Sequence, residues 1–387
     1  MTDAMVELRR SLHRIAELSG QEERTAALIR ETLEGIGADE IVTGLGGHGV
    51  AAVYESGSIG PRVLIRCDLD ALPIDEDSDS EDASRTPGIS HTCGHDGHMA
   101  IVTGVAHALA AKRPDTGSVV LLYQPAEETG TGARSVLDDP RFAKLVPDMA
   151  FALHNVPGYP LGEVVARVGV FASTARSLRV ELVGSTSHAA APEQGASPTA
   201  ALAEILSVWP GMPQATTSID EPALVTVVHA KLGEEALGTT PGRATAIATL
   251  RARNSDVMAR LSRGCSEIAV GIAAAHGLTA DCEWTDEFPC VVNEAGAVAA
   301  VEQAAEAAGT GFRSLEAPFS WTEDFGHFTE VCPSAMFGLG AGVDAAPLHH
   351  PAYRFPDELI GTGARIFLGV LDRVLNDAED SPVEVTR

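Results

Sequence analysis

The stretch Val119-Val120-Leu121-Leu122-Tyr123, followed at once by Gln124-Pro125-Ala126-Glu127-Glu128, decides the fold class. Its five consecutive apolar residues predict a short strand buried on both faces, as in a sheet covered by helices. Two adjacent carboxylates then stand at the carboxyl end of this strand, where open α/β sheets place their sites. A solvated acidic pair at a helix N-terminus, favoured by the helix dipole, is the alternative.

Similar apolar runs occur on both sides of this stretch. Residues 63–65, 149–153 and 336–339 indicate further buried strands. Segments with apolar residues at helical spacing separate them, and these predict helices over residues 5–18, 21–36, 98–111, 294–308 and 357–375. The alternation of strands and helices predicts an α/β domain with a largely covered sheet.

The middle of the chain has a different pattern. Residues 177–183 alternate polar and apolar side chains, which is typical of a half-exposed antiparallel strand. Further strands are expected at 224–228, 244–253 and 279–284, with helices at about 197–208 and 255–276. We therefore predict an α/β catalytic domain formed by residues 1–172 and 285–387, split by an inserted α+β satellite domain over residues 173–284.

Length and charge exclude several classes of function. The chain has 387 residues, which indicates two domains, and its 54 acidic and 27 basic residues give a formal net charge of −27. This acidity disfavours nucleic-acid binding and docking on an anionic membrane. We find no secretory signal and no apolar run long enough to span a membrane, so a cytoplasmic location is expected. The six scattered cysteines are no disulfide framework, and a reduced thiol can bind a metal.

The densest chemical signal is His91-Thr92-Cys93-Gly94-His95-Asp96-Gly97-His98, just before a predicted helix. Its two glycines let the backbone fold so that alternate side chains converge. Cysteine and histidine suit Zn²⁺, Mn²⁺ or a neighbouring transition metal. The structural alternative is a helix-entry loop with buried capping groups, which would leave many polar atoms unpaired at a cost in free energy.

Two further histidines follow predicted strands. His154 comes directly after residues 149–153, and His349 follows residues 336–339. A single histidine at a strand end is more often an ordinary hydrogen-bonded residue than a ligand. Glu127–Glu128 follow residues 119–123, and Cys67-Asp68-Leu69-Asp70 follow residues 63–65. Four strand ends that all offer metal-type ligands or a proton acceptor are hard to explain by chance, and together they indicate one metal site.

These motifs resemble a known family, the metallo-amidohydrolases that include hippurate hydrolase, indole-acetyl-amino-acid hydrolase and N-acetyl-diaminopimelate deacetylase. Its relatives include aminoacylase and dinuclear-metal carboxypeptidases. The matches span nearly the whole chain: Arg9 to His13 with Glu17-Leu18, Arg66 to Ile74, Cys93 to His98, Gln124 to Glu128, Leu153 to Asn155, Ser187 to Ala189, Thr249 to Arg251, Glu323 to Phe325 and Leu348 to Pro351. The Cys-Gly-His-Asp-Gly-His and Gln-Pro-Ala-Glu-Glu pair is the most specific.

The resemblance implies roles for the residues of the metal site. It implies two divalent metal ions per subunit, zinc or manganese, bridged by the Cys93 thiolate. His95 and His154 would complete one site, and Glu128 and His349 the other. Glu127 would be the general base that takes a proton from the attacking water. The carboxylates of Asp68 and Asp70 would orient the ligands.

The resemblance also implies roles for the satellite domain, which is the family's usual dimerisation surface. His188 would reach an active site across a homodimer and stabilise the oxyanion, and Arg251 would bind the substrate carboxylate. The recognition side departs from the family pattern at Ala189, Glu193 and Gly238, where the family has Gly, His and Asn; Thr322 also replaces a serine. Weaker or altered recognition is expected, unless Thr239 or Thr240 supplies the missing hydrogen bond.

The sequence therefore predicts a metal-dependent amidohydrolase that acts on N-acyl amino acids. A dipeptidase or carboxypeptidase on the same scaffold is the alternative among enzymes. A non-catalytic metal-binding protein is the alternative from another class, and Glu127 argues against it, because metal storage needs no free carboxylate beside the site. The identity of the acyl group stays open.

Overall fold

The computed structural model describes residues 2–77 and 81–376, and the chain divides into two compact units. The first unit comprises Met1–Phe171, Val291–Pro318 and Asp324–Arg387. The second unit comprises Ala172–Cys290 and Phe319–Glu323. The predicted fold class, a split α/β unit with an inserted α+β unit, is confirmed. No helix among the described residues is both long and apolar enough to cross a membrane.

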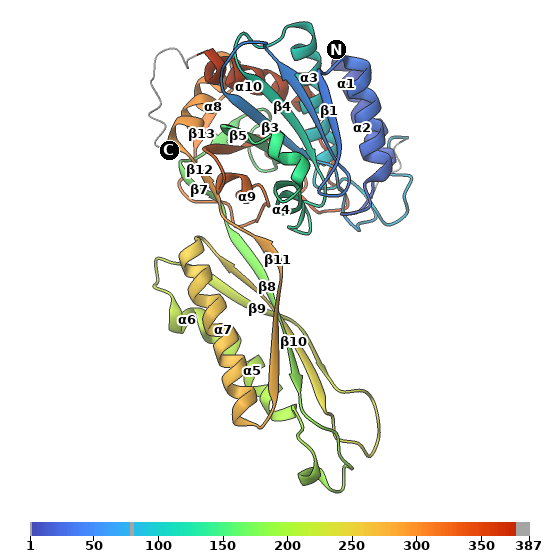
Figure 1. Ribbon diagram of the computed structural model, residues 1–387, viewed down its shortest axis with the longest axis vertical. Coiled ribbons are helices and arrows are strands. Elements are labelled where there is room, and N and C mark those ends of the chain that lie inside the picture. Colours follow the sequence, from blue (N-terminus) through green and yellow to red (C-terminus); the bar gives the residue numbers. More distant parts are fainter. Residues whose placement is uncertain (1, 78–80, 377–387) are drawn as a thin grey trace. The chain divides into compact units, whose positions relative to one another are not determined.

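An eight-stranded sheet forms the centre of the first unit, in the order β1-β2-β4-β3-β5-β14-β6-β13 (Figure 1). These strands are β1 (Glu40–Leu45), β2 (Gly49–Glu55), β3 (Arg62–Asp68), β4 (Ser118–Gln124), β5 (Met149–Val156), β6 (Val164–Ala166), β13 (Phe312–Ser314) and β14 (Ser334–Gly340). The pairs β3–β4, β3–β5 and β5–β14 are parallel, so four adjacent strands end at the same edge. A small separate sheet pairs β7 (Gly169–Ala172) with β12 (Val291–Asn293).

The central strands of the sheet are buried on both faces, as their apolar runs predict, whereas the edge strands β1 and β13 are partly exposed. Every residue of β4 is buried, and so is every residue of β14. Helices whose apolar residues join one core with the sheet are α1 (Thr2–Arg14), α2 (Glu23–Ile36), α3 (His95–Ala111), α8 (Ala295–Ala307) and α10 (Glu358–Asn376). Three shorter segments, α4 (Gly132–Leu137), η1 (Pro140–Lys144) and α9 (Gly326–Thr329), complete the first unit.

The first two predicted helices are shorter than their periodicity indicates. The first was expected to reach residue 18 but ends at Arg14, because Leu18 leaves the helix and forms a parallel bridge with Ala71. Gly20 then takes a φ of 76°, and α2 begins only at Glu23. This connection between the helices reaches the carboxyl end of β3, so it contributes to the site described below.

The second unit is a four-stranded antiparallel sheet with helices on one face, in the order β11-β8-β10-β9. Its elements are β8 (Thr174–Val183), η2 (Pro192–Gln194), α5 (Thr199–Val208), η3 (Trp209–Gly211), α6 (Met212–Thr216), β9 (Ala223–Leu232), β10 (Arg243–Ala252), α7 (Ser255–Ala275) and β11 (Thr279–Phe288). Alternate residues of β10 are buried against this unit's own core, as the polar–apolar alternation of such strands predicts.

Candidate metal centre

The candidate ligands lie at the carboxyl edge of the four central parallel strands. Asp68 ends β3, the Glu127–Glu128 pair follows β4, His154 lies near the end of β5, and His349 follows β14. The remaining ligands lie at the start of α3, which begins at His95, three residues before the predicted start. The sheet therefore gathers at one edge side chains that are far apart in sequence, as expected for an open α/β fold.

Gly94 brings Cys93 and His95 to this edge. It has a φ of 95°, a left-handed conformation that favours glycine, and it precedes the first residue of α3. A Cβ atom at Gly94 would lie 2.5 Å from the Asn155 side-chain oxygen. The glycine therefore permits both the turn into the helix and the close approach of β5.

The structure places the five predicted ligands in two overlapping groups. The ligand atoms of Cys93, His95 and His154 lie within 4.8 Å of one another, and so do those of Cys93, Glu128 and His349. Cys93 Sγ is 3.4 Å from His154 Nε2, and His349 Nε2 is 3.6 Å from Glu128 Oε1. The two groups share the Cys93 sulfur, which is the arrangement that a ligand bridging two ions requires.

Hydrogen bonds orient the two buried imidazoles toward this cluster. His95 Nδ1 donates to the Asp70 carbonyl oxygen at 2.8 Å, and His154 Nδ1 donates to the Asn155 carbonyl oxygen at 2.8 Å. In each ring the Nε2 lone pair is left for the cluster. Within the described residues, His95 Nε2 and Glu128 Oε1 are buried without a hydrogen-bond partner. Such orphaned atoms, together with a thiol, are a donor set that fits a transition metal ion.

Burial and the neighbouring carboxylates shift the pKa values of three candidate ligands. Burial alone would lower the pKa of His95, but Asp68, Asp70 and Glu128 raise it to about 10. Burial raises the pKa of Glu128 to about 7, and burial followed by the charge of Glu128 raises the pKa of the Cys93 thiol well above its usual value. A bound divalent cation would oppose these shifts and keep thiolate and carboxylate ionised.

A buried ionic network supports Asp68. Arg66 Nη1 donates to Asp68 Oδ2 at 2.7 Å, and His98 Nδ1 donates to Asp68 Oδ1 at 2.8 Å. Arg66 Nη2 also donates to Asp324 Oδ1 at 2.6 Å. Burial would raise the pKa of Asp68, but the Arg66 charge and then the neighbouring imidazoles hold it well below its usual range. The sequence motifs contain Arg66, His98 and Asp324 but give no signal of this network.

Asp70 connects the ends of β3 and β4. Its Oδ2 accepts from the Glu128 backbone N–H at 3.0 Å and from Ser19 Oγ at 2.6 Å. The carbonyl oxygen of the same residue binds His95, as described above. Asp70 therefore contacts the backbone of one candidate ligand and the ring of another, and its orienting role stays a prediction.

One candidate ligand, His349, and the residue before Glu127, Ala126, have left-handed backbones. Ala126 has a φ of 52° and His349 a φ of 64°; Asp286 is the other non-glycine residue with positive φ in the described part of the chain. Such conformations cost free energy and persist where surrounding contacts hold them, often at functional sites. Glu127 follows Ala126, is 5% exposed, and its Oε2 lies 4.0 Å from His95 Nε2.

The remaining predicted residues, His188 and Arg251, belong to the second unit. His188 forms an antiparallel bridge with Thr239, and its Nδ1 accepts from the Ala190 N–H at 3.0 Å. Arg251 lies in β10 with an exposed side chain. Gly238 has a φ of 84°, and its carbonyl oxygen accepts from the Ala189 N–H at 2.8 Å. A glycine suits this turn on conformational grounds.

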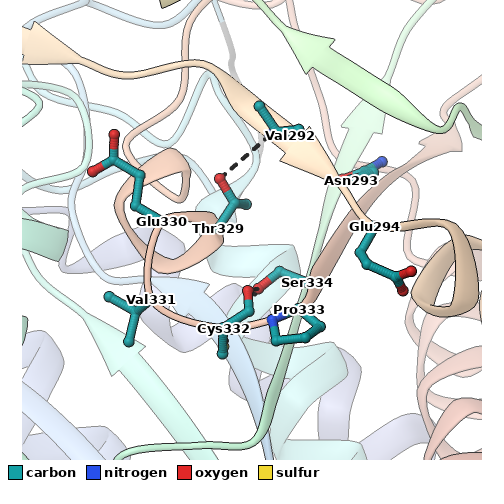
Figure 2. A pocket seen from close by; sticks show the side chains of 9 residues that line it. All are labelled: Val292, Asn293, Glu294, Thr329, Glu330, Val331, Cys332, Pro333 and Ser334. Atoms are coloured by element: carbon teal, nitrogen blue, oxygen red, sulfur yellow. Dashed lines mark hydrogen bonds between the residues drawn. The ribbon is translucent and has the colours of Figure 1, made fainter. Parts of the chain in front are cut away.

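A hollow at the amino-terminal end of β14 lies away from these ligands (Figure 2). It has a volume of about 390 Å³, and Figure 2 shows its lining, with the Val292 N–H donating to Thr329 Oγ1 at 3.3 Å. Glu294 and Cys332 also contribute to it. The amino end of a parallel strand faces the edge opposite the candidate ligands, so this hollow is no part of the metal centre.

The covered α/β sheet, with a thiol, imidazoles and paired carboxylates at its carboxyl edge, defines the class of metal-dependent hydrolases. Residues 64–373 match the peptidase family M20/M25/M40, and the chain belongs to this family. The predicted family and the predicted class of enzyme, a hydrolase of amide bonds, are confirmed.

Characterised relatives and solved structures agree with this assignment. The chain is 30% identical over 367 residues to the N-acetylcysteine deacetylase of Bacillus subtilis, covering 94% of each chain. It is 30% identical to the N-acetyldiaminopimelate deacetylase of Exiguobacterium sibiricum, covering 91% of this chain and 94% of that one. A dinuclear metal-binding M20 peptidase from Bacillus subtilis superposes with a TM-score of 0.80 at 28% identity, covering 96% of this chain and 98% of that chain.

Proposed function

We propose that this chain hydrolyses the amide bond of N-acyl amino acids with two bound divalent ions, zinc or manganese. The observation that carries the proposal is the pair of three-ligand groups that share Cys93, one with His95 and His154 and the other with Glu128 and His349. The names of the two deacetylases support the substrate class, and that of the solved peptidase supports two ions. A cytoplasmic location stays a prediction.

In this proposal Glu127 is the general base. Divalent ions held by the five ligands would lower the pKa of a water and polarise the scissile carbonyl. The Glu127 carboxylate then accepts the proton of the attacking water and returns it to the leaving amine. Both carboxylates lie beside His95 Nε2, with Glu127 Oε2 at 4.0 Å and Glu128 Oε1 at 3.8 Å, but Glu128 Oε1 also lies 3.6 Å from His349 Nε2. On this difference we assign metal binding to Glu128 and proton transfer to Glu127.

Asp68 and Asp70 orient the site in this mechanism. The Arg66 guanidinium keeps Asp68 ionised at the edge of the cluster. Asp70 holds the His95 ring through its carbonyl oxygen and the Glu128 backbone through its carboxylate. These contacts fix the orientation of the ligand side chains before a metal binds, which reduces the structural reorganisation that metal binding requires.

The second unit would supply substrate recognition and the dimer contact. We propose that His188 stabilises the oxyanion across a homodimer and that Arg251 pairs with the substrate carboxylate. The exposure of both side chains in the second unit is compatible with these roles. At Gly238 no side-chain amide is available, and the Thr240 hydroxyl beside it already bonds Ser187 at 2.8 Å. Altered recognition near the scissile amide follows from this difference.

A substrate screen with metal analysis tests the proposed function. The purified protein is stripped with a chelator, and zinc, manganese or cobalt is returned before N-acetyl, N-benzoyl and indole-acyl amino acids and dipeptides are assayed. We expect two ions per chain and metal-dependent release of the free amino acid from N-acyl substrates. Cleavage of dipeptides alone would favour the peptidase alternative. Two bound ions without any hydrolysis would favour a metal-binding role, and no bound ion would refute the proposal.

A further inference from the structure

Glu22 is a buried carboxylate in the connection between α1 and α2 that the mechanism above does not use. It is 0% exposed and occupies the N-cap position of α2, yet its side chain makes no capping hydrogen bond to that helix. Its Oε1 instead accepts from the backbone N–H of Ala126 at 2.8 Å and from that of Gly20 at 2.8 Å. Burying a carboxylate is costly, so these contacts need an explanation.

The contact with Ala126 gives the buried Glu22 carboxylate a structural role, because Ala126 has a left-handed backbone conformation and directly precedes Glu127. Its φ of 52° is unfavourable for a residue with a Cβ atom by about 1 kcal/mol or more, and neighbouring contacts must hold it. The Ala126 carbonyl oxygen accepts from Gly132 N at 3.1 Å and from Thr129 Oγ1 at 3.3 Å. Its N–H is held by Glu22.

The two members of the glutamate pair thus have separate anchors. The Glu128 backbone N–H is held by Asp70 Oδ2 at 3.0 Å, whereas the residue before Glu127 is held by Glu22 Oε1. We propose that Glu22 is a positioning residue. It holds Ala126 in its left-handed backbone conformation and thereby orients the Glu127 carboxylate. The inference rests on the proposed function, because it assumes that Glu127 moves the proton.

Two substitutions at Glu22 and one matched control separate positioning from general stability. Glu22→Ala removes the acceptor for Ala126, while Glu22→Gln keeps an oxygen at the Oε1 position. The Gln side chain has the same length and shape as that of Glu, so Glu22→Gln preserves the geometry of the contact with Ala126. Glu17→Ala is the control, since Glu17 Oε2 accepts from the Thr25 backbone N–H at 2.8 Å in the same connection and does not contact Ala126.

We expect Glu22→Ala to lower kcat by about 10²-fold, as a misplaced catalytic group does, with KM changed by less than about threefold and two bound ions retained. Glu22→Gln should keep kcat within about threefold of the parent protein. Glu17→Ala should lower the melting temperature without this loss of kcat. Should Glu22→Ala not fold, Glu22→Asp, whose shorter side chain cannot span to Ala126, replaces it. Equal losses of kcat in the Glu22→Ala and Glu17→Ala proteins at equal loss of stability would overturn the inference.

Amide hydrogen exchange tests the same inference without activity. The peptide over residues 124–131 should exchange faster in Glu22→Ala than in the parent protein, and Glu22→Gln should restore its protection. An unchanged exchange rate in Glu22→Ala would refute the claim that Glu22 stabilises the backbone conformation at Ala126. The two proposals can fail separately. If Glu22→Ala loses protection but the parent protein hydrolyses no N-acyl amino acid, the role of the Glu22–Ala126 contact is supported and the proposed function is refuted.

Discussion

His13 gives a prediction about stability that does not depend on the proposed activity. Its ring is 5% exposed and lies between two carboxylates, with Nδ1 2.9 Å from Asp96 Oδ2 and Nε2 2.8 Å from Glu76 Oε2. Arg9 Nη1 donates to the same Asp96 oxygen at 3.0 Å. Burial would lower the pKa of His13, but Asp96 and then Glu76 raise it to about 9.

The direction and size of the effect follow from proton linkage. Because the folded-state pKa of His13 lies above its ordinary value of 6.5, the imidazolium stabilises the fold fully below pH 6.5. This contribution is lost as the pH rises through 9. A shift from 6.5 to about 9 corresponds to about 3 kcal/mol at 1.36 kcal/mol per unit. The neighbouring His91, whose pKa burial lowers to about 4, affects stability only at acid pH.

The assay compares urea unfolding of the parent protein and of His13→Gln at pH 6 and pH 10, both saturated with metal. We compare the free energy of unfolding of the parent protein with that of the variant at each pH. The advantage of the parent protein should be about 3 kcal/mol larger at pH 6 than at pH 10. Asp96, Glu76 and His91 interact with His13 and their pKa values change with it, whereas titrating groups that do not interact with His13 contribute equally in both proteins and cancel in this difference. A difference between the two proteins that stays constant within about 0.5 kcal/mol across this range would refute the reasoning.

Three further predictions concern the proposed site. Glu127→Gln should retain folding and both ions while kcat falls by about 10²- to 10⁴-fold, whereas Glu128→Ala should lose metal in elemental analysis; a highly active Glu127→Gln protein would show that another group is the base. His188→Ala should lower kcat by about 10²- to 10³-fold at unchanged metal content, and a fully active monomer in light scattering would contradict a contribution across a dimer. Arg251→Ala should lose the parent protein's preference for free-acid substrates over their amides, and equal discrimination by both proteins would assign that role elsewhere.

The sequence predicted the parts of the site that local patterns determine. Short apolar runs marked β3, β4, β5 and β14, and the residues after them marked the edge where ligands gather. The hairpin of β1 and β2 was not predicted. Its first strand is only partly buried and has no continuous apolar run, whereas β2 is buried from Gly49 to Tyr54 and does carry an apolar run that could have marked it. The early end of α1 was also missed, since it depends on the bridge from Leu18 to the distant Ala71.

The supporting network could not be predicted from local patterns at all. Arg66 and Asp324 are 258 positions apart in the chain, and only the fold brings their charges to 2.6 Å. A buried ion pair is weak evidence for stability, because desolvation opposes the attraction between the charges. Its value here is geometric, since Arg66 contacts Asp68 and Asp324 at the edge that carries the candidate ligands.

The adjacent glutamates show most clearly what a sequence leaves undetermined. Glu127 and Glu128 have the same chemistry, and an extended strand would send neighbouring side chains to opposite faces. The turn begun by Ala126 at a φ of 52° ends the strand geometry and leaves both carboxylates beside His95, with Glu127 Oε2 4.0 Å and Glu128 Oε1 3.8 Å from its Nε2. What distinguishes them is the contact of Glu128 with His349 and the different backbone anchors, Asp70 and Glu22. Because these anchors come from distant parts of the chain, tertiary structure, not the motif, provides the physical basis for the separate roles that we propose.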